Sequence, residues 1–455
     1  MTEPTLLEQM EVVTGLWAQL RLPDRARYLE RAAQAVIDEF DDLCLALASE
    51  SQRPRTEVAS LELLGATDAL RWLARDGRQL FGAHRLPLPR SLHPLTRASA
   101  GHAPVGVVGV RGAPGAPFAQ PLAAVGAALL AGNGAILVPA GDAHGAGQRA
   151  VRILARAGVP EGLVRVEAAT PAGVEVVLDY RAAAGRGADV MIVLADANLR
   201  NAASGALWGA CAGAGRMAGS VKRVYVAREC HARFLEELVG AARELVLGDP
   251  LVPETQLGPL PDEQAAAELE AAIAEAVSLG AVVHCGGRAA LPGASGALFA
   301  PVVLTGVPAG ARLARERVAG PVLVVAAVAD SVEAVALANA GEVGIGASIW
   351  SSDRRAAVRI ARELRARYVW GNDHLPVPPA RETAAGALAR CTRPQVIAWD
   401  PPSRRPPWRY PYDAAGVSDA RALAELRSSR EGDRERALRD GVPAVARVLG
   451  RTLRD

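Results

Sequence analysis

Residues 104–139, PVGVVGVRGAPGAPFAQPLAAVGAALLAGNGAILVP, decide the fold, because they form one complete strand-helix-strand pattern. An uninterrupted apolar run at residues 105–110 precedes a Gly/Pro-rich turn at residues 112–117 and an Ala/Leu-rich segment of helical length at residues 118–131. A Gly-Asn-Gly break then leads into a second apolar run at residues 135–138. Short apolar strands on either side of a helix are typical of a parallel sheet that is buried on both faces.

The loop that follows the first strand is the predicted position of a ligand site. In open parallel sheets, ligands bind where the carboxyl ends of the strands meet the next loops. Residues 111–116 offer one arginine there, and no acid, hydroxyl or amide side chain.

The composition indicates a globular protein of two or three domains. The chain has 455 residues, half of them apolar, and 51 basic residues balance 49 acidic ones. Such a balance argues against a nucleic-acid partner. The five cysteines form no CxxC pair, which predicts reduced thiols in the cytoplasm and no metal site. Three prolines break the uncharged stretch at residues 112–141, so we expect no membrane span.

Several motifs resemble those of the aldehyde dehydrogenase superfamily. They are the strand-helix-strand unit with its ALLAGN ending, AGVPEGLVRV at residues 157–166, LGDPLVPETQLGPL at residues 247–260 and ARERVAGPVLVV at residues 314–325. The resemblance covers about residues 10–412. It implies an α/β fold with two Rossmann-like parallel-sheet domains and a small oligomerisation flap.

The resemblance also implies the domain boundaries. Residues 1–85 with 104–188 would form a degenerate cofactor-binding domain, and residues 189–390 a catalytic-type domain. Residues 86–103 with 391–412 would form the oligomerisation flap, and residues 413–455 a helical tail. Between the strand at residues 163–166 and the strand at residues 190–194, the chain is too short for the family's further helix and E-L-G-G segment. We expect only a strand such as 174–178 and a loop there.

The family's catalytic positions hold unreactive residues in this sequence. Gly215 and Arg223 match the family's nucleophile segment N-x-G-Q-x-C, but Ala218 occupies the cysteine position. The position of the catalytic Glu falls on Ala184, and that of the oxyanion-binding Asn falls on Gly115. Thiolate attack on the aldehyde carbon is the covalent step of the family, and alanine removes it. We therefore expect no catalytic residue.

The family's cofactor positions are altered as well. Val138 replaces a lysine that binds the cofactor ribose, Arg317 replaces a glutamate that holds the ribose hydroxyls, and Ala319 replaces a phenylalanine that packs on the nicotinamide. An arginine offers only donors where an acceptor is needed. We therefore expect no cofactor, with NAD and NADP bound poorly.

Three functions remain open at this point. The losses favour a catalytically inactive protein that serves as a structural or regulatory subunit, assembled with itself or with an active aldehyde dehydrogenase paralogue through the flap and the strand at residues 395–399. The first alternative is a divergent but active NAD(P)-dependent aldehyde oxidoreductase that uses Cys211 or a water. The second is a small-anion binding module in which Arg111, Arg216 and Arg317 form the site.

Overall fold

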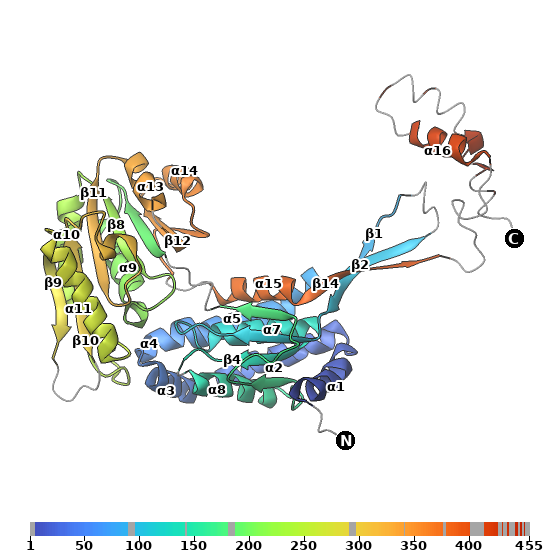
Figure 1. Ribbon diagram of the computed structural model, residues 1–455, viewed down its shortest axis with the longest axis horizontal. Helices are drawn as coiled ribbons and strands as arrows, with labels where there is room; N and C mark the ends of the chain where they lie inside the picture. Colours follow the sequence, from blue (N-terminus) through green and yellow to red (C-terminus); the bar gives the residue numbers. More distant parts are fainter. Residues whose placement is uncertain are drawn as a thin grey trace. The chain divides into compact units, whose positions relative to one another are not determined.

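A computed structural model describes residues 5–89, 96–141, 143–180, 187–290, 297–340, 342–375, 379–400 and 414–425, together with residues 430, 435, 442–444, 446, 447 and 450. The chain divides into two compact units (Figure 1). The first comprises Met1–Leu80 and Pro104–Thr392, and the second Phe81–Ala103 and Arg393–Asp455. Both predicted sheet-bearing domains fall in the first unit, so the boundary at residue 188 stays a prediction.

The first unit contains a parallel four-stranded sheet in the order β5-β4-β3-β6. Its strands are β3 (Val107–Arg111), β4 (Gly134–Val138), β5 (Val164–Val166) and β6 (Val176–Asp179). Helix α7 (Ala119–Ala131) connects β3 to β4, which confirms the strand-helix-strand prediction. The short connection after β5 forms β6, which pairs with β3.

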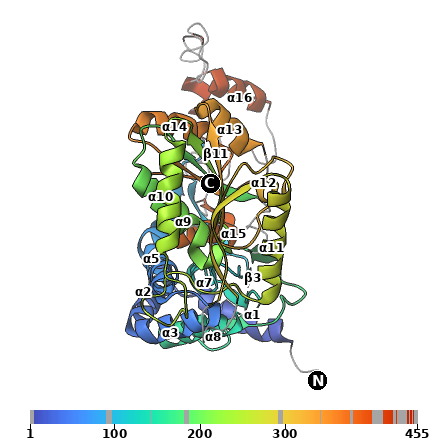
Figure 2. The ribbon, with the colours of Figure 1, turned by 90° about the vertical axis from the view of Figure 1, so that its left-hand side faces the viewer.

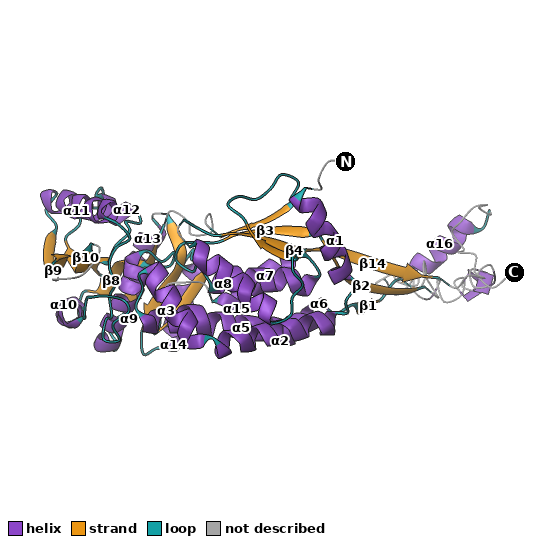
Figure 3. Cartoon of the chain, turned by 90° about the horizontal axis from the view of Figure 1, so that it is seen from below, coloured by secondary structure: helices purple, strands orange, loops and turns teal. Residues whose placement is uncertain are grey.

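Helices cover both faces of this sheet (Figure 3). Val107, Ile136 and Val138 pack against Met10 of α1 (Leu6–Ala18). On the opposite face of β4, Leu137 lies against Gly147 of α8 (His144–Arg156). The remaining helices of the amino-terminal segment are α2 (Leu22–Asp38), α3 (Phe40–Ser51), α4 (Arg55–Val58), η1 (Ala59–Leu64), α5 (Gly65–Trp72), η2 (Leu73–Gly77) and α6 (Arg78–Phe81).

A seven-stranded sheet in the order β13-β12-β7-β8-β11-β10-β9 forms the rest of the first unit, parallel except for the β9–β10 pair. Alternate residues face opposite layers of helices, several of which are seen in Figure 2. The strands are β7 (Ala188–Val193), β8 (Val221–Ala227), β9 (Val282–Ala289), β10 (Leu298–Thr305), β11 (Val322–Val328), β12 (Val343–Trp350) and β13 (Tyr368–Gly371). The helices are α9 (Leu199–Cys211), η4 (Ala212–Gly215), α10 (His231–Glu244), α11 (Glu263–Ser278), α12 (Arg312–Arg315), α13 (Ser331–Asn339), α14 (Arg354–Glu363) and α15 (Ala380–Arg390).

The second unit contains a three-stranded sheet in the order β1-β2-β14. Its strands are β1 (His84–Leu86), β2 (Arg97–Pro104) and β14 (Thr392–Trp399), and α16 (Gly416–Glu425) follows in the chain. The strand expected at residues 395–399 is therefore present in β14. Residues 401–413 and most of the predicted tail lie outside the described residues.

Asn133 of the Gly-Asn-Gly break joins three segments of the first unit. Its Oδ1 accepts hydrogen bonds from the backbone N–H groups of Val105 and Gly106, at 2.7 and 3.0 Å. Its Nδ2 donates to the carbonyl oxygens of Ala128 and Cys391, at 3.2 and 2.9 Å. The side chain is fully buried, so no water replaces these bonds if the amide is removed.

We predict that Asn133→Ala lowers the free energy of unfolding by about 3 kcal/mol, because it leaves several buried backbone groups without partners. Urea denaturation followed by circular dichroism measures the change. Asn201→Ala, at an exposed position on α9, is the matched control and should stay within about 0.5 kcal/mol of the unmodified chain. Equal effects of the two substitutions would contradict the role assigned to Asn133.

Candidate functional site

A cavity of about 240 Å³ lies at the loop that follows β3, the place that the sequence predicted. Its lining includes Gly115 of this loop, Ala218 of the turn that follows α9, and Arg317 after α12. Three family positions that are far apart in the sequence therefore meet in one cavity.

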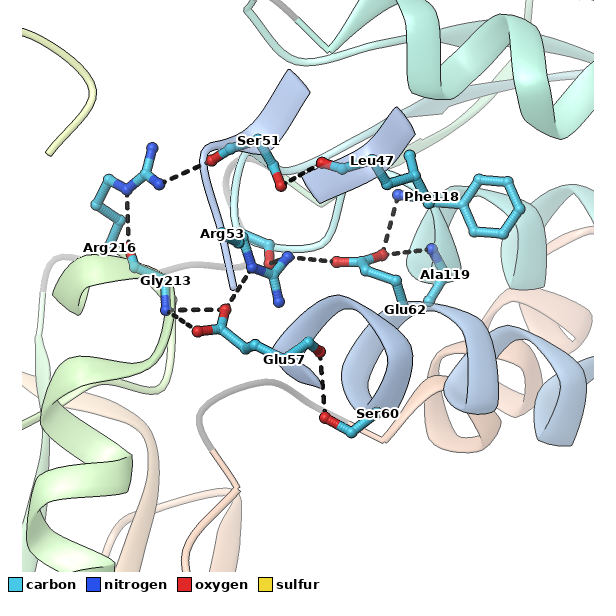
Figure 4. A network of polar contacts seen from close by, with 11 residues as sticks. Leu47, Ser51, Arg53, Glu57, Ser60, Glu62, Phe118, Ala119, Gly213 and Arg216 are labelled. Carbon is cyan, nitrogen blue, oxygen red and sulfur yellow. Dashed lines mark hydrogen bonds and ion pairs between the residues drawn. The ribbon is translucent and has the colours of Figure 1, made fainter. Parts of the chain in front are cut away.

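A buried charge network supports the loop and the turn (Figure 4). Arg53 forms ion pairs with Glu57 and with Glu62, the latter at 2.7 Å, and donates to the carbonyl of Gly115 at 3.3 Å. All three charged side chains are at most 5% exposed. Burial alone would lower the pKa of Arg53, but the two carboxylates outweigh it and raise that pKa. The network therefore holds two carboxylates and one guanidinium away from water.

Glu62 lies in the π-helical turn η1 and binds the start of α7. Its Oε2 accepts from the backbone N–H groups of Phe118 and Ala119, at 3.1 and 2.7 Å. These amides have no partner within their own helix, and a carboxylate at a helix N-terminus also interacts favourably with the helix dipole. The carboxylate thus fixes where the loop ends and α7 begins.

The turn after α9 has an unusual backbone. Gly213, Ala214 and Gly215 all have positive φ values, of 60°, 53° and 74°. Both oxygens of Glu57 accept from the N–H of Gly213, at 2.9 and 3.0 Å. A β-carbon on Gly215 would lie 2.0 Å from the carbonyl oxygen of Gly320, so only glycine fits there. Gly213 and Gly215 therefore serve the backbone conformation of this turn.

Lys222, the only lysine of the chain, also binds this turn. Its Nζ donates to the carbonyls of Gly215, at 3.0 Å, and of Gly320. The side chain is 2% exposed. Burial lowers its pKa to about 7, and the nearby Arg317 acts in the same direction. The ammonium group is thus paired only with carbonyl oxygens among the described residues.

Two further side chains, Arg317 and His374, hold the following carbonyls, and burial lowers the pKa of His374. Arg317 donates to the carbonyl oxygen of Ala218 at 3.2 Å, and the Nε2 of His374 lies 2.8 Å from the carbonyl oxygen of Gly219. Burial lowers the pKa of Arg317, while Asp189 opposes that shift. Burial raises the pKa of Asp189 to about 8. Arg317 therefore uses some of its N–H groups to bind the turn, and its side chain also lines the cavity.

The other predicted cofactor positions lie elsewhere. Val138 is buried in the apolar cluster with Met10 and Ile136, whereas Ala319 is exposed and outside the cavity lining. Ala184 lies outside the described residues. Arg111 bonds Thr170 at 3.1 Å and pairs with Asp179 at 3.3 Å, and of these residues only Asp179 belongs to the lining.

Cys211 is separated from this cavity. It lines a different one, of about 680 Å³, together with Glu57 and Trp208. Burial raises the pKa of its thiol to about 12, so almost no thiolate forms near neutral pH. The sequence-based alternative in which Cys211 acts as the nucleophile therefore finds no support in the geometry.

The cavity also contains residues that the sequence analysis did not identify. They are Gln120 of α7, Arg367 before β13, and Glu382 and Arg390 of α15. The sequence analysis assigned none of them a role, and three separate segments of the fold bring them to one cavity. Only a hydrophobic pattern that predicted the packing of α15 on α7 could have suggested that these residues line the same cavity.

Among the residues that the structure describes, no group of three His, Cys, Asp or Glu side chains is arranged to hold a metal ion. Within the same part of the chain, no helix combines the length and the apolar character that a membrane span requires.

Comparison with known proteins decides the family. A sequence profile described as "Aldehyde dehydrogenase family" matches residues 7–178 and 181–387. The chain belongs to the aldehyde dehydrogenase family. Within it, the chain is 30% identical over 420 residues to succinate-semialdehyde dehydrogenase (NADP(+)) of Deinococcus radiodurans, covering 85% of both proteins.

Solved structures of other aldehyde dehydrogenases share the fold. Succinate-semialdehyde dehydrogenase from Burkholderia pseudomallei superimposes with a TM-score of 0.77 and 25% identity, covering 87% of this chain and 89% of that one. Indole-3-acetaldehyde dehydrogenase in complex with NAD+ gives a TM-score of 0.79 at 23% identity, covering 87% and 88%. The predicted α/β aldehyde dehydrogenase fold is confirmed.

The expectation that the chain has no cofactor is wrong by these comparisons, because its relatives are named for NADP(+) and found with NAD+. The expectation counted lost side-chain hydrogen bonds at Val138 and Arg317, each worth only about 0.5–1.5 kcal/mol. Backbone amides at helix N-termini and arginine side chains also bind phosphates, and the count ignored them.

We predict that Lys222 makes stability depend on pH. Its folded pKa of about 7 lies below the ordinary 10.5, so between these values the unfolded chain binds more protons and the free energy of unfolding rises with pH. One proton gives a slope of at most about 1.4 kcal/mol per pH unit. Lys222→Met should remove this contribution, as measured by urea denaturation at pH 7, 8 and 9. Parallel curves for the two proteins would contradict the prediction.

Proposed function

We propose that this chain is a nicotinamide-dinucleotide-binding member of the aldehyde dehydrogenase family that does not oxidise aldehydes through a covalent thiol intermediate, and that it works as a subunit of an oligomer. The observation that carries this proposal is Ala218, which lies in the cavity together with Gly115 and Arg317. The described lining of that cavity contains no cysteine. A methyl group cannot attack an aldehyde carbon.

The residues of the cleft fit a dinucleotide in part. Arg216, Arg317, Arg367 and Arg390 supply guanidinium groups, which suit phosphate oxygens. The carboxylate that would accept from the ribose hydroxyls is absent at Arg317, so the ribose contact would be weaker. The cavity is smaller than the roughly 300–1,000 Å³ of drug-sized ligand sites, and it would hold one end of the dinucleotide. When bound, the nicotinamide would supply a hydride acceptor or donor.

An active, divergent NAD(P)-dependent aldehyde oxidoreductase is the second candidate. The names of the relatives favour it, and so does Glu382, whose carboxylate belongs to the cavity lining. With Cys211 buried as a thiol, water would be the nucleophile and Glu382 the base that activates it.

We predict that the protein binds NADPH, seen as a change in nicotinamide fluorescence, but forms no detectable NADPH from NADP and succinate semialdehyde. Ala218→Cys should remain inactive, because a thiol alone lacks a base and an oxyanion amide. The same variant should gain a label from iodoacetamide, which shows that its new thiol is accessible.

Turnover by the unmodified protein that Glu382→Gln abolishes and Cys211→Ala leaves unchanged would establish the second candidate instead. Absence of any binding of NADPH or NADH would refute the dinucleotide part of the proposal.

Assembly is the second part of the proposal. On β14, Val396, Ile397 and Trp399 are 56%, 60% and 70% exposed, and β14 is an edge strand of its sheet. An edge strand with apolar side chains on both faces invites pairing with another chain. The partner would be a second copy or an active paralogue.

All five cysteines are free thiols, which supports a cytoplasmic location.

We predict that Ile397→Pro shifts the protein from oligomer to monomer or aggregate, because proline cannot donate a ladder hydrogen bond. Light scattering after size-exclusion chromatography measures the mass. Ile397→Ala is the matched control: it keeps the N–H and should weaken assembly less. A monomeric unmodified protein, alone and with a candidate paralogue, would refute the assembly proposal.

A further inference from the structure

The cavity that contains Ala218 has an excess of positive charge. Arg216, Arg317, Arg367 and Arg390 line it, against the carboxylates of Asp179 and Glu382. Asp179 already pairs with Arg111, which lies outside the lining. The described part of the wall therefore carries guanidinium charge that the protein's own carboxylates do not neutralise.

The direct contacts of these arginines are with carbonyl oxygens and an aromatic ring, although Glu57 near Arg216 and Asp189 near Arg317 oppose the lowering of their pKa values by burial. Arg216 donates to the carbonyls of Gly213 and Ser51, at 2.8 and 3.1 Å, and Arg390 donates to that of Val177 at 2.7 Å. Arg317 donates to the carbonyl of Ala218, and the guanidinium of Arg367 lies over the ring of Tyr368. Across the described ranges, none of the four forms an ion pair with a carboxylate.

A guanidinium has five N–H donors, and carbonyl partners use only one or two of them here. Neutral carbonyls hold Arg216, Arg317 and Arg390 in place but leave their charge available. Arginines fixed in this way are suited to bidentate binding of a carboxylate or a phosphate group.

Gln120 adds a second requirement on the ligand. Its side chain lines the same cavity and is 8% exposed, yet its Oε1 has no hydrogen-bond partner among the described residues. A buried acceptor without a partner costs free energy that a donor on a ligand would recover. A hydroxyl or amino group would supply that donor.

We propose that this cavity binds a small organic oxyanion, a carboxylate or a phosphate ester, that also carries a hydroxyl or amino group. The inference rests on the proposed function in one respect: the family cleft is still used for binding. It adds the chemical class of a second ligand. Ala218 fits this role, because a methyl group in place of a thiol leaves the cavity unable to capture an aldehyde but free to hold an acid.

The test is isothermal titration calorimetry of the full-length protein without dinucleotide, at pH 7.5 and low salt. The probes are malate, which has carboxylates and a hydroxyl; succinate, which lacks the hydroxyl; glycerol 3-phosphate; inorganic phosphate; and butane-1,4-diol, which is uncharged. Malate or glycerol 3-phosphate should bind at least tenfold more tightly than succinate or inorganic phosphate, and the diol should not bind. The tighter of the first two identifies the anion as carboxylate or phosphate.

Variants locate the site. Arg367→Gln and Arg390→Gln change exposed lining residues, and each should weaken binding of the preferred probe at least fivefold. Gln120→Leu should remove the preference for the probe with a hydroxyl while keeping part of the affinity. Arg359→Gln, an exposed arginine of α14 outside the cavity, is the matched control and should bind like the unmodified protein. Circular dichroism confirms that each variant is folded.

The outcomes separate this inference from the proposed function. If NADPH binds but none of the anions does, or if Arg359→Gln weakens anion binding as much as Arg390→Gln, the inference is wrong and the proposed function stands. If the anions bind as expected but no dinucleotide does, the dinucleotide proposal fails and the inference stands.

Discussion

The ion pairs of Arg53 with Glu57 and Glu62 are the interaction on which the site depends. They join α4 and η1 to the start of α7, to the loop at Gly115 and to the turn at Gly213. Buried charges are expensive to remove from water, and removal of one partner leaves an uncompensated buried charge. Because each carboxylate also binds backbone amides, the network fixes backbone positions as well as side chains. One guanidinium, that of Arg53, thus positions both the loop at Gly115 and, through Glu57, the turn at Gly213.

Nitrogen-bearing side chains define the conformation of the turn that would carry the family's nucleophile. Lys222, Arg317 and His374 approach successive carbonyl groups of residues 215–219. Of the three consecutive residues with positive φ, Gly213 and Gly215 adopt it freely, but Ala214 carries a β-carbon and is strained there. The backbone of the turn is therefore kept in a defined shape. Such a scaffold suits binding and assembly, which need shape and charge but no nucleophile.

Much of the candidate site could be predicted from the sequence, but not how its parts are used. The resemblance to the family's motifs pointed to Gly115, Ala218 and Arg317, and the structure brings all three to one cavity. Val138 and Ala319 were identified in the same way, yet one is buried in an apolar cluster and the other is exposed outside the lining. The expectation of no cofactor was wrong because it assumed that the replaced side chains make all of the protein's contacts with the cofactor. Backbone amides, and arginines such as Arg367 and Arg390, are not among the family's cofactor motifs. The count of lost side-chain hydrogen bonds therefore did not include them.

The sequence by itself determined the strand-helix-strand unit around Asn133, the family, and the absence of a thiol at Ala218. The strand-helix-strand unit follows from short-range patterns, because hydrophobic periodicity and turn residues act over a few neighbouring positions. The family and the position of Ala218 follow from the resemblance to the family's motifs. Only the tertiary structure decided that Arg53 is buried between two carboxylates and that Cys211 lines a different cavity from Ala218. It alone also decided that four arginines line one cavity. The reason is that burial and electrostatic pairing depend on segments up to several hundred residues apart, whose meeting is set by the packing of helices on sheets and leaves no local trace in the sequence.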